Sequence, residues 1–178
     1  MKANDEHGTY KTFGKRRSLR MSGYDYRESR AYHITWGTYQ CRKLLGSNGL
    51  ASEVCRILEE EARRTPAKRR TQVATLPCDL YAYCVMPDHV HVLLQPNGGK
   101  LIQYVQAVKG KSTRAYWKLG GGTGKLWQRG FYDHILRCEE SLQGIAQYIL
   151  ANPVRAGLTE DIFSYPFSGS AVFKIEEL

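Results

Sequence analysis

The stretch DLYAYCVMPDHVHVLLQP, residues 79–96, determines the predicted fold because it contains two strand-like runs joined by a short connection. Residues 79–86 and residues 89–96 are rich in aromatic and β-branched side chains, which are typical of strands. The segment MPD at 86–88 leaves room only for a tight turn between them. We therefore predict a β-hairpin.

The sequence on both sides of this hairpin predicts five further elements, from composition and from the spacing of apolar residues. They are a strand at 31–40, a helix at 51–64, a helix at 100–119, a strand at 131–138 and a helix at 139–152. We expect Pro153 to stop the last helix, since the residue before a proline avoids helical geometry. The order β-α-β-β-α-β-α begins with the ferredoxin-like arrangement. The predicted fold class is α+β, a ferredoxin-like sandwich with a four-stranded antiparallel sheet and an additional C-terminal helix.

The chain length of 178 residues suits one compact domain with tails. Residues 1–25 include a run of basic side chains with few apolar anchors, so we predict a basic, flexible tail there. The domain is placed at residues 26–168, and residues 169–178 are assigned to a C-terminal tail.

The composition favours a nucleic-acid partner. Lys and Arg number 26 against 17 Asp and Glu, and the net charge of +9 attracts polyanions, although such charge can also serve solubility alone. No run of about 18 apolar residues is present, so we predict no membrane-spanning helix. The five cysteines form no CxxC pair, which argues against a zinc ribbon or a disulfide framework. We expect reduced thiols in a cytoplasmic, nucleoid-associated protein.

His89 and His91 lie one residue apart on the predicted strand at 89–96. Side chains alternate along a strand, so both imidazoles point to one face, with backbones roughly 6–7 Å apart. From that separation two imidazoles can converge on one metal ion, but a complete site needs at least one more ligand. The alternative is a pair of histidines that are merely hydrogen-bonded on a half-exposed sheet.

Tyr148 and Asn152 are four residues apart on the last predicted helix and therefore share one of its faces. An amide oxygen is a neutral hard ligand that suits Mg²⁺ or Mn²⁺. A tyrosine oxygen beside such an ion could attack a phosphate and form a covalent link. The alternative is that Tyr148, one of twelve tyrosines, only packs where the helix meets the sheet.

Four segments in order resemble the single-tyrosine transposases of the HUH endonuclease superfamily, and most closely the REP-associated tyrosine transposases. They are YCVMPDHVHVLLQP, LIQYVQAVKGKSTR, LWQRGFYDHILR and YILANPVRAGL, and the resemblance covers about residues 30 to 168. It implies an enzyme that cleaves and rejoins single-stranded DNA near a small hairpin, through a covalent 5′-phosphotyrosine. The implied partner is hairpin-forming DNA like a repetitive extragenic palindrome.

The same resemblance implies a role for each candidate site residue. The family's histidine signature stands here as His89-Val90-His91, and the nucleophilic tyrosine corresponds to Tyr148. The third ligand of a divalent ion, Mg²⁺ or Mn²⁺, corresponds to Asn152, where many insertion-sequence relatives have glutamine. Asparagine is one methylene shorter, so its contact with the metal is less secure than those of the histidines.

Basic and aromatic residues outside these motifs are candidate DNA contacts. The candidates are Lys109, Lys111 and Arg114 on the predicted helix at 100–119, Trp127 and Arg129 after the glycine-rich loop, and Arg42 after the first strand. Lys and Arg hold phosphates without reading sequence, and an aromatic ring can stack an unpaired base. The alternatives are a solvated helix face for the basic residues and a place in the core for Trp127.

Two other functions are compatible with the same residues. One is a hairpin DNA- or RNA-binding protein, derived from a transposase, that no longer cuts. The other is a metal-dependent hydrolase that uses water and leaves a free 5′-phosphate. We expect a monomer rather than a homodimer. His134 could carry a proton or support the site, but a packing or hydrogen-bonding role is favoured, and His33 is left equally open.

Overall fold

The computed structural model describes residues 30–46, 49–63, 78–96, 101–136 and 141–175. The predicted basic tail at 1–25 lies outside these residues. The strands are β1 (Tyr32–Gly37), β2 (Asp79–Val85), β3 (His89–Gln95), β4 (Tyr132–Ile135) and β5 (Ser168–Gly169). The helices are α1 (Leu50–Arg63), α2 (Leu101–Tyr116), α3 (Leu142–Leu150) and α4 (Asn152–Arg155). No helix among the described residues is long and apolar enough to cross a membrane.

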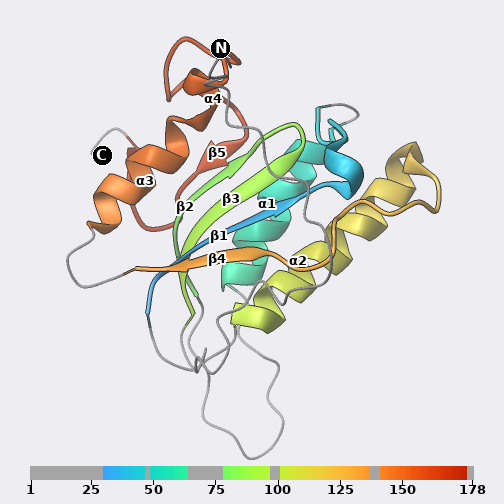
Figure 1. Ribbon diagram of the computed structural model, residues 1–178, viewed down its shortest axis with the longest axis horizontal. Helices are drawn as coiled ribbons and strands as arrows, with labels where there is room; N and C mark the ends of the chain where they lie inside the picture. The colour runs from blue at the N-terminus through green and yellow to red at the C-terminus, as the bar shows by residue number, and fades with distance from the viewer. Residues whose placement is uncertain (1–29, 47–48, 64–77, 97–100, 137–140, 176–178) are drawn as a thin grey trace, which may run out of the picture.

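The sheet has the order β4-β1-β3-β2-β5, and its neighbouring strands are antiparallel (Figure 1). The hairpin of β2 and β3 is confirmed, and its turn is closed by the Met86 N–H, which donates to the His89 carbonyl over 2.8 Å. The α+β prediction is therefore confirmed. The described part of the sheet has one strand more than the four predicted, β5, which pairs with the outer edge of β2 over two residues.

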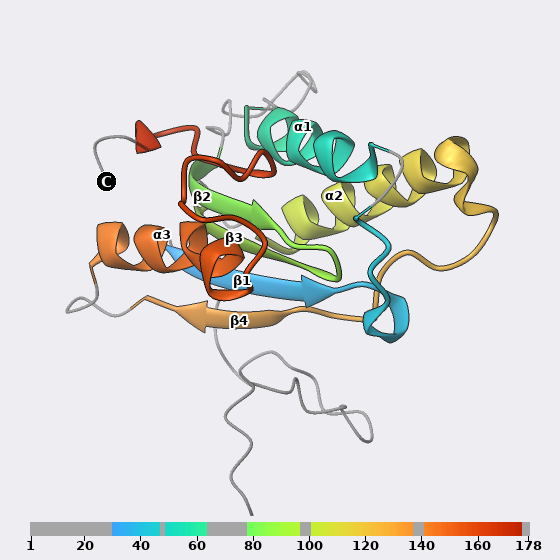
Figure 2. The same cartoon turned by 90° about the horizontal axis from the view of Figure 1, so that it is seen from above.

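The two faces of the sheet carry different helices. In Figure 2, α1 and α3 lie on opposite sides of the strands. Alternation along β3 sends Val90, Val92 and Leu94 into the larger core, which α1 and α2 complete. Leu93 instead joins a smaller apolar cluster with Ile149 of α3. The histidines of β3 lie on this second face, because they alternate with the valines.

The C-terminal helical segment corrects the prediction for Pro153. Helix α3 ends at Leu150, but a second short helix, α4, begins at Asn152 and has Pro153 in its first turn. The first N–H groups of a helix have no acceptor within the helix, so proline is tolerated there. Instead of stopping the helical path, Pro153 starts its next segment.

Candidate functional site

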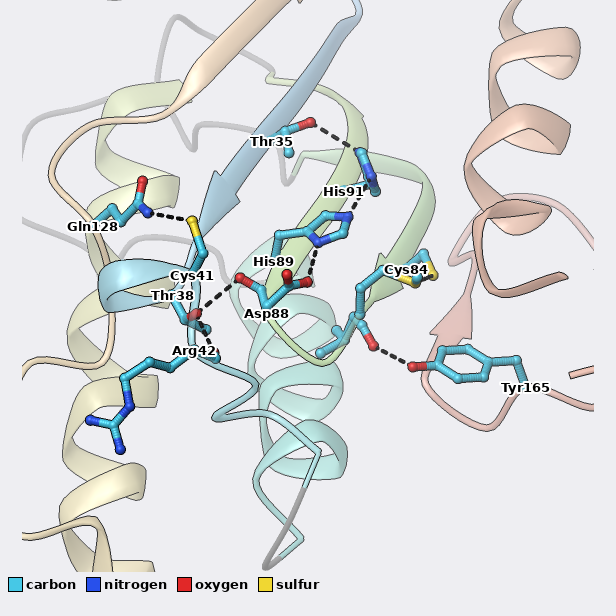
Figure 3. A network of polar contacts seen from close by, with 12 residues as sticks. Thr35, Thr38, Cys41, Arg42, Cys84, Asp88, His89, His91, Gln128 and Tyr165 are labelled. Atoms are coloured by element: carbon cyan, nitrogen blue, oxygen red, sulfur yellow. Dashed lines mark hydrogen bonds and ion pairs between the residues drawn. The ribbon is translucent and has the colours of Figure 1, made fainter. Parts of the chain in front are cut away.

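The two imidazoles of β3 meet at the end of the strand beside the hairpin turn. The Nε2 atoms of His89 and His91 are 3.1 Å apart (Figure 3). On the neighbouring strand β1, Gly37 lies opposite His89 and Thr35 lies opposite His91. Glycine leaves room beside the ring of His89, and threonine offers a hydroxyl to the ring of His91. The predicted shared face of the two histidines is thus present, and β1 supports it.

Asp88 orients His89. The Nδ1–H of His89 donates to the Asp88 carboxylate over 2.6 Å, so Nε2 is the ring nitrogen of His89 that can present a lone pair. This hydrogen bond lowers the pKa of Asp88, while partial burial of the carboxyl works in the opposite direction. The Asp88 backbone is itself held, because its carbonyl accepts from the N–H and the hydroxyl of buried Thr38, at 2.8 and 3.0 Å. Sequence reasoning missed Asp88, although it directly precedes His89.

We expect Asp88→Asn to weaken Mn²⁺ binding about 10- to 100-fold, because a neutral amide no longer fixes the tautomer and direction of His89. Isothermal titration with Mn²⁺ measures the effect. Asp79→Asn is the matched control, since Asp79 lies at the far end of the same hairpin, opposite Gln95. Equal Mn²⁺ affinity in the Asp88 and Asp79 variants would contradict this role.

His91 is buried and held from β1. Its Nδ1 lies 3.0 Å from Thr35 Oγ1 and 3.2 Å from His33 Nε2. The pKa of His91 is lowered to about 2, chiefly by burial and also by the nearby charges of His89, His33 and Arg155. The ring is therefore neutral at ordinary pH and can present a lone pair. His33, whose role the sequence left open, is a direct neighbour of His91, and burial lowers its own pKa to about 4.

These residues fit a divalent metal ion. If two nitrogens each lie about 2.1 Å from one ion and the nitrogen–ion–nitrogen angle is about 90°, as in octahedral coordination, the nitrogens are about 3 Å apart. This distance matches the separation of the two Nε2 atoms. Both Nδ1 atoms have hydrogen-bonding neighbours, as expected of metal-bound histidines. The described residues contain no group of three His, Cys, Asp or Glu that could hold an ion alone. The pair therefore leaves positions open for an amide, water or phosphate.

Tyr148 lies on α3 at the side of the histidine pair. Its ring is 53% exposed, and its centroid is 6.4 Å from the ring of His33 in an edge-on arrangement. The guanidinium of Arg155 lies 4.1 Å over the Tyr148 ring, and its Nη2 donates to the Tyr148 carbonyl over 2.9 Å. The phenol is thus reachable from outside and has a cation beside it. Sequence reasoning did not single out Arg155, whose place depends on the turn from α3 into α4.

Asn152 uses its amide nitrogen to close the end of α3. The Nδ2 donates to the carbonyls of Tyr148 and Ile149, at 3.2 and 3.0 Å. These carbonyls belong to the last turn of α3, where a helix lacks some of its own backbone donors. The side chain therefore has a structural task here, and its role as a metal ligand stays a prediction.

The candidate DNA contacts divide into exposed and engaged side chains. Arg42, Arg114 and Arg129 are exposed. By contrast, Lys109 donates to the carbonyls of Gln128 and Gly130, at 2.8 and 2.7 Å, and burial lowers its pKa to about 8. Lys111 forms an ion pair with the buried carboxylate of Glu61. Both lysines thus hold the chain together, which a helical pattern of basic residues does not reveal.

Trp127 belongs to the core and not to a base-stacking surface. Its side chain is 8% exposed, packs edge-on against Trp36 and donates from Nε1 to Ser112 Oγ over 2.8 Å. The interpretation of Trp127 as a stacking platform is therefore corrected in favour of the core alternative. The physical reason is the pairing of Thr38 with Trp127, which draws the loop before β4 against β1.

We expect Trp127→Phe to lower the free energy of unfolding by about 1–3 kcal/mol, because Ser112 Oγ loses its buried partner. The affinity of the folded variant for oligothymidylate should equal that of the wild type. Urea unfolding and fluorescence anisotropy measure the two quantities. Unchanged stability together with weaker binding would restore the stacking role.

Comparisons with known proteins found similar sequences and a similar structure. The family model described as "Transposase IS200 like" matches residues 27–152. Over 103 residues the chain is 30% identical to a Haemophilus influenzae protein named as a REP-associated tyrosine transposase. The aligned region covers 52% of this chain and 58% of that protein. Over 94 residues it is 27% identical to the REP-associated tyrosine transposase of Escherichia coli K12, covering 52% and 54%. The matches thus span little more than half the length of these relatives.

A solved structure shares the fold. The REP-associated tyrosine transposase bound to a REP hairpin superposes with a TM-score of 0.60 at 21% identity, covering 83% of this chain and 82% of that one. At this identity the likeness establishes the architecture of the sheet and its helices.

Proposed function

The chain belongs to the IS200-like transposase family, and we propose that it cleaves and rejoins single-stranded DNA beside a hairpin through a covalent 5′-phosphotyrosine. One observation carries the proposal. Two imidazoles with converging Nε2 atoms lie on the sheet face against which α3 packs, α3 carries the exposed Tyr148, and His33 contacts both His91 and Tyr148. A tyrosine that only packed at a helix boundary would not need to be half exposed beside such a pair.

In the proposed reaction Tyr148 is the nucleophile. Its phenol oxygen forms a bond to phosphorus while the bond from phosphorus to the 3′ oxygen breaks. The proton that the phenol loses balances the proton that the departing 3′ oxygen gains. The product is a 5′-phosphotyrosine and a free 3′-hydroxyl, and attack by a 3′-hydroxyl reverses the step without ATP.

His89 and His91 would hold a divalent ion, with Asn152 as the proposed third ligand. When bound, Mg²⁺ or Mn²⁺ polarises the scissile phosphate and offsets its developing charge. Asp88 and Thr35 keep the two imidazoles aligned for this task. The amide nitrogen of Asn152 can keep its bonds to α3 while the amide oxygen serves as a ligand, because the two atoms are separate groups.

Cations near the histidine pair support a phosphate substrate. Arg155 stacks on Tyr148, and its charge acts on His91. The charge of Lys43 acts on Asp88. We propose that exposed Arg42, Arg114 and Arg129 continue this charge along the bound strand, whereas Lys109 and Lys111 contribute mainly to the scaffold.

The proposed partner is hairpin-forming DNA of the repetitive extragenic palindrome type, with a single-stranded segment next to the stem. The hairpin named for the structural relative supports this choice, as does the net charge of +9. We propose that the protein acts as a monomer on cytoplasmic, nucleoid DNA.

The test is to incubate the protein with labelled single-stranded hairpin oligonucleotides and Mg²⁺ or Mn²⁺, and then to run a denaturing gel. A labelled band at the mass of protein plus DNA fragment supports the proposal. Cleavage with a free 5′-phosphate and no adduct would favour a hydrolase that uses water. Tight binding without cleavage would favour a hairpin-binding protein that has lost its chemistry.

A further inference from the structure

Among the described residues, α3 covers only part of the sheet face that carries the histidines. This helix packs chiefly against β2 and β3, while β4 forms the far edge of the sheet next to β1. On β4 the ring of Tyr132 is 56% exposed. A large exposed aromatic beside a candidate phosphate site is a surface on which a base can stack.

Tyr132 lies in the same cross-strand row as the buried histidine. It is directly opposite Thr35, and Thr35 is directly opposite His91. Residues that lie directly opposite each other in an antiparallel sheet share a face, so Tyr132 faces the same side as His91. At about 4.8 Å between strands, the two backbones are about 10 Å apart. A nucleotide attached to a phosphate at the histidines can span that distance.

Gln128 lies on the same face, beside Gly37, which is two residues along β1 from Thr35. Its N–H donates to the Gly37 carbonyl over 3.0 Å, and its side-chain Cδ lies 3.5 Å from where a Cβ on Gly37 would stand. Gly37 is opposite His89 and two residues from Thr35, a rise of about 6–7 Å. Gln128 and Tyr132 thus lie beside β1 at neighbouring positions on this face, Gln128 at Gly37 and Tyr132 at Thr35.

The carboxamide is held there by an unusual turn. Gln40 and Cys41 are two successive non-glycine residues with positive φ, 58° and 55°. The Nε2 of Gln128 donates to Cys41 Sγ over 3.2 Å (Figure 3). Left-handed geometry at two such residues costs free energy, and strain of this kind gathers at binding sites. The turn therefore holds the Gln128 side chain over Gly37, the residue opposite His89.

We infer that Tyr132 and Gln128 form a subsite for one unpaired base next to the scissile phosphate. The inference rests on the proposed function, since it needs a single strand at the histidines. The phenol ring stacks on the face of the base. The carboxamide both donates and accepts at the edge of the base, a pattern that suits adenine.

The test measures the binding of oligothymidylate and oligoadenylate by fluorescence anisotropy, without any need for cleavage. Tyr132→Leu should weaken both by about 5- to 150-fold, as expected for losing one stacked base, whereas Tyr132→Phe should bind like the wild type. Phe163→Leu is the matched control, because Phe163 is also exposed but belongs to the C-terminal segment. Gln128→Met should reduce the preference for oligoadenylate over oligothymidylate.

Photocrosslinking adds a direct readout. In oligothymidylate that carries 5-iodouracil, the crosslinked peptide should contain Tyr132, and the crosslink should be lost in Tyr132→Leu. Wild-type affinity in that variant, or a crosslink elsewhere, would overturn the subsite while leaving the proposed function intact. If the wild-type protein binds neither oligonucleotide, the proposed function fails together with the subsite.

Discussion

Replacing Tyr148 by phenylalanine is expected to abolish the covalent protein–DNA adduct while hairpin binding is retained. Phenylalanine keeps the ring under Arg155 and the edge contact with His33, so the end of α3 should not move. Only the oxygen that would bond to phosphorus is removed. Loss of a nucleophile lowers rates by a thousandfold or more, on the order of that seen for other covalent enzymes. Denaturing gels measure the adduct, and anisotropy measures binding.

Tyr116→Phe is the matched control for this variant. Tyr116 lies at the end of α2, on the opposite side of the sheet, so its hydroxyl should have no effect on the adduct. An adduct that persists in Tyr148→Phe would move the nucleophile to another residue. Cleavage that persists without an adduct would instead favour activated water.

The face of the histidine pair could be predicted from the sequence because its cause is local. Strand alternation in HVHVLLQ places both imidazoles opposite the apolar residues, and the structure has this arrangement. The residues that hydrogen-bond to the pair could not be predicted in this way. Thr35 and His33 reach His91 through the register of β1 with β3, more than fifty residues away in sequence. A one-residue change of register would have brought other side chains there.

The places of Trp127 and Lys109 in the fold could not be predicted from the sequence for a related reason. Composition marks an aromatic ring and a basic side chain as candidates for DNA contact, but the packing of the segment before β4 decides which of them is exposed. That segment lies on α2, so Lys109 binds its carbonyls and Trp127 is buried against Ser112. The exposed aromatic on β4 is Tyr132 instead, and its position in the histidine row follows only from strand pairing.

Removing either imidazole is expected to abolish metal-dependent cleavage and to leave hairpin binding largely intact. His89→Ala is the cleaner variant because this ring is partly exposed at the end of β3, whereas His91 is buried against Thr35 and His33. Each variant loses one of two nitrogens that approach each other to 3.1 Å. Mn²⁺ affinity should therefore fall by more than the ~10- to 100-fold expected when a group that only orients a ligand is lost.

His134→Ala is the matched control, because it removes a histidine that is near the pair but is not a proposed metal ligand. His134 lies on β4 opposite His33, on the same face as the pair, so His134→Ala provides the comparison with a variant that merely disturbs the packing of this face. We expect His134→Ala to keep its Mn²⁺ affinity in isothermal titration, and His89→Ala to lose it while melting at nearly the wild-type temperature. If the His89 variant still binds Mn²⁺ and still forms the adduct, the metal site lies elsewhere. Because the affinity is measured without DNA, a failure to bind metal cannot be confused with a failure to bind the hairpin.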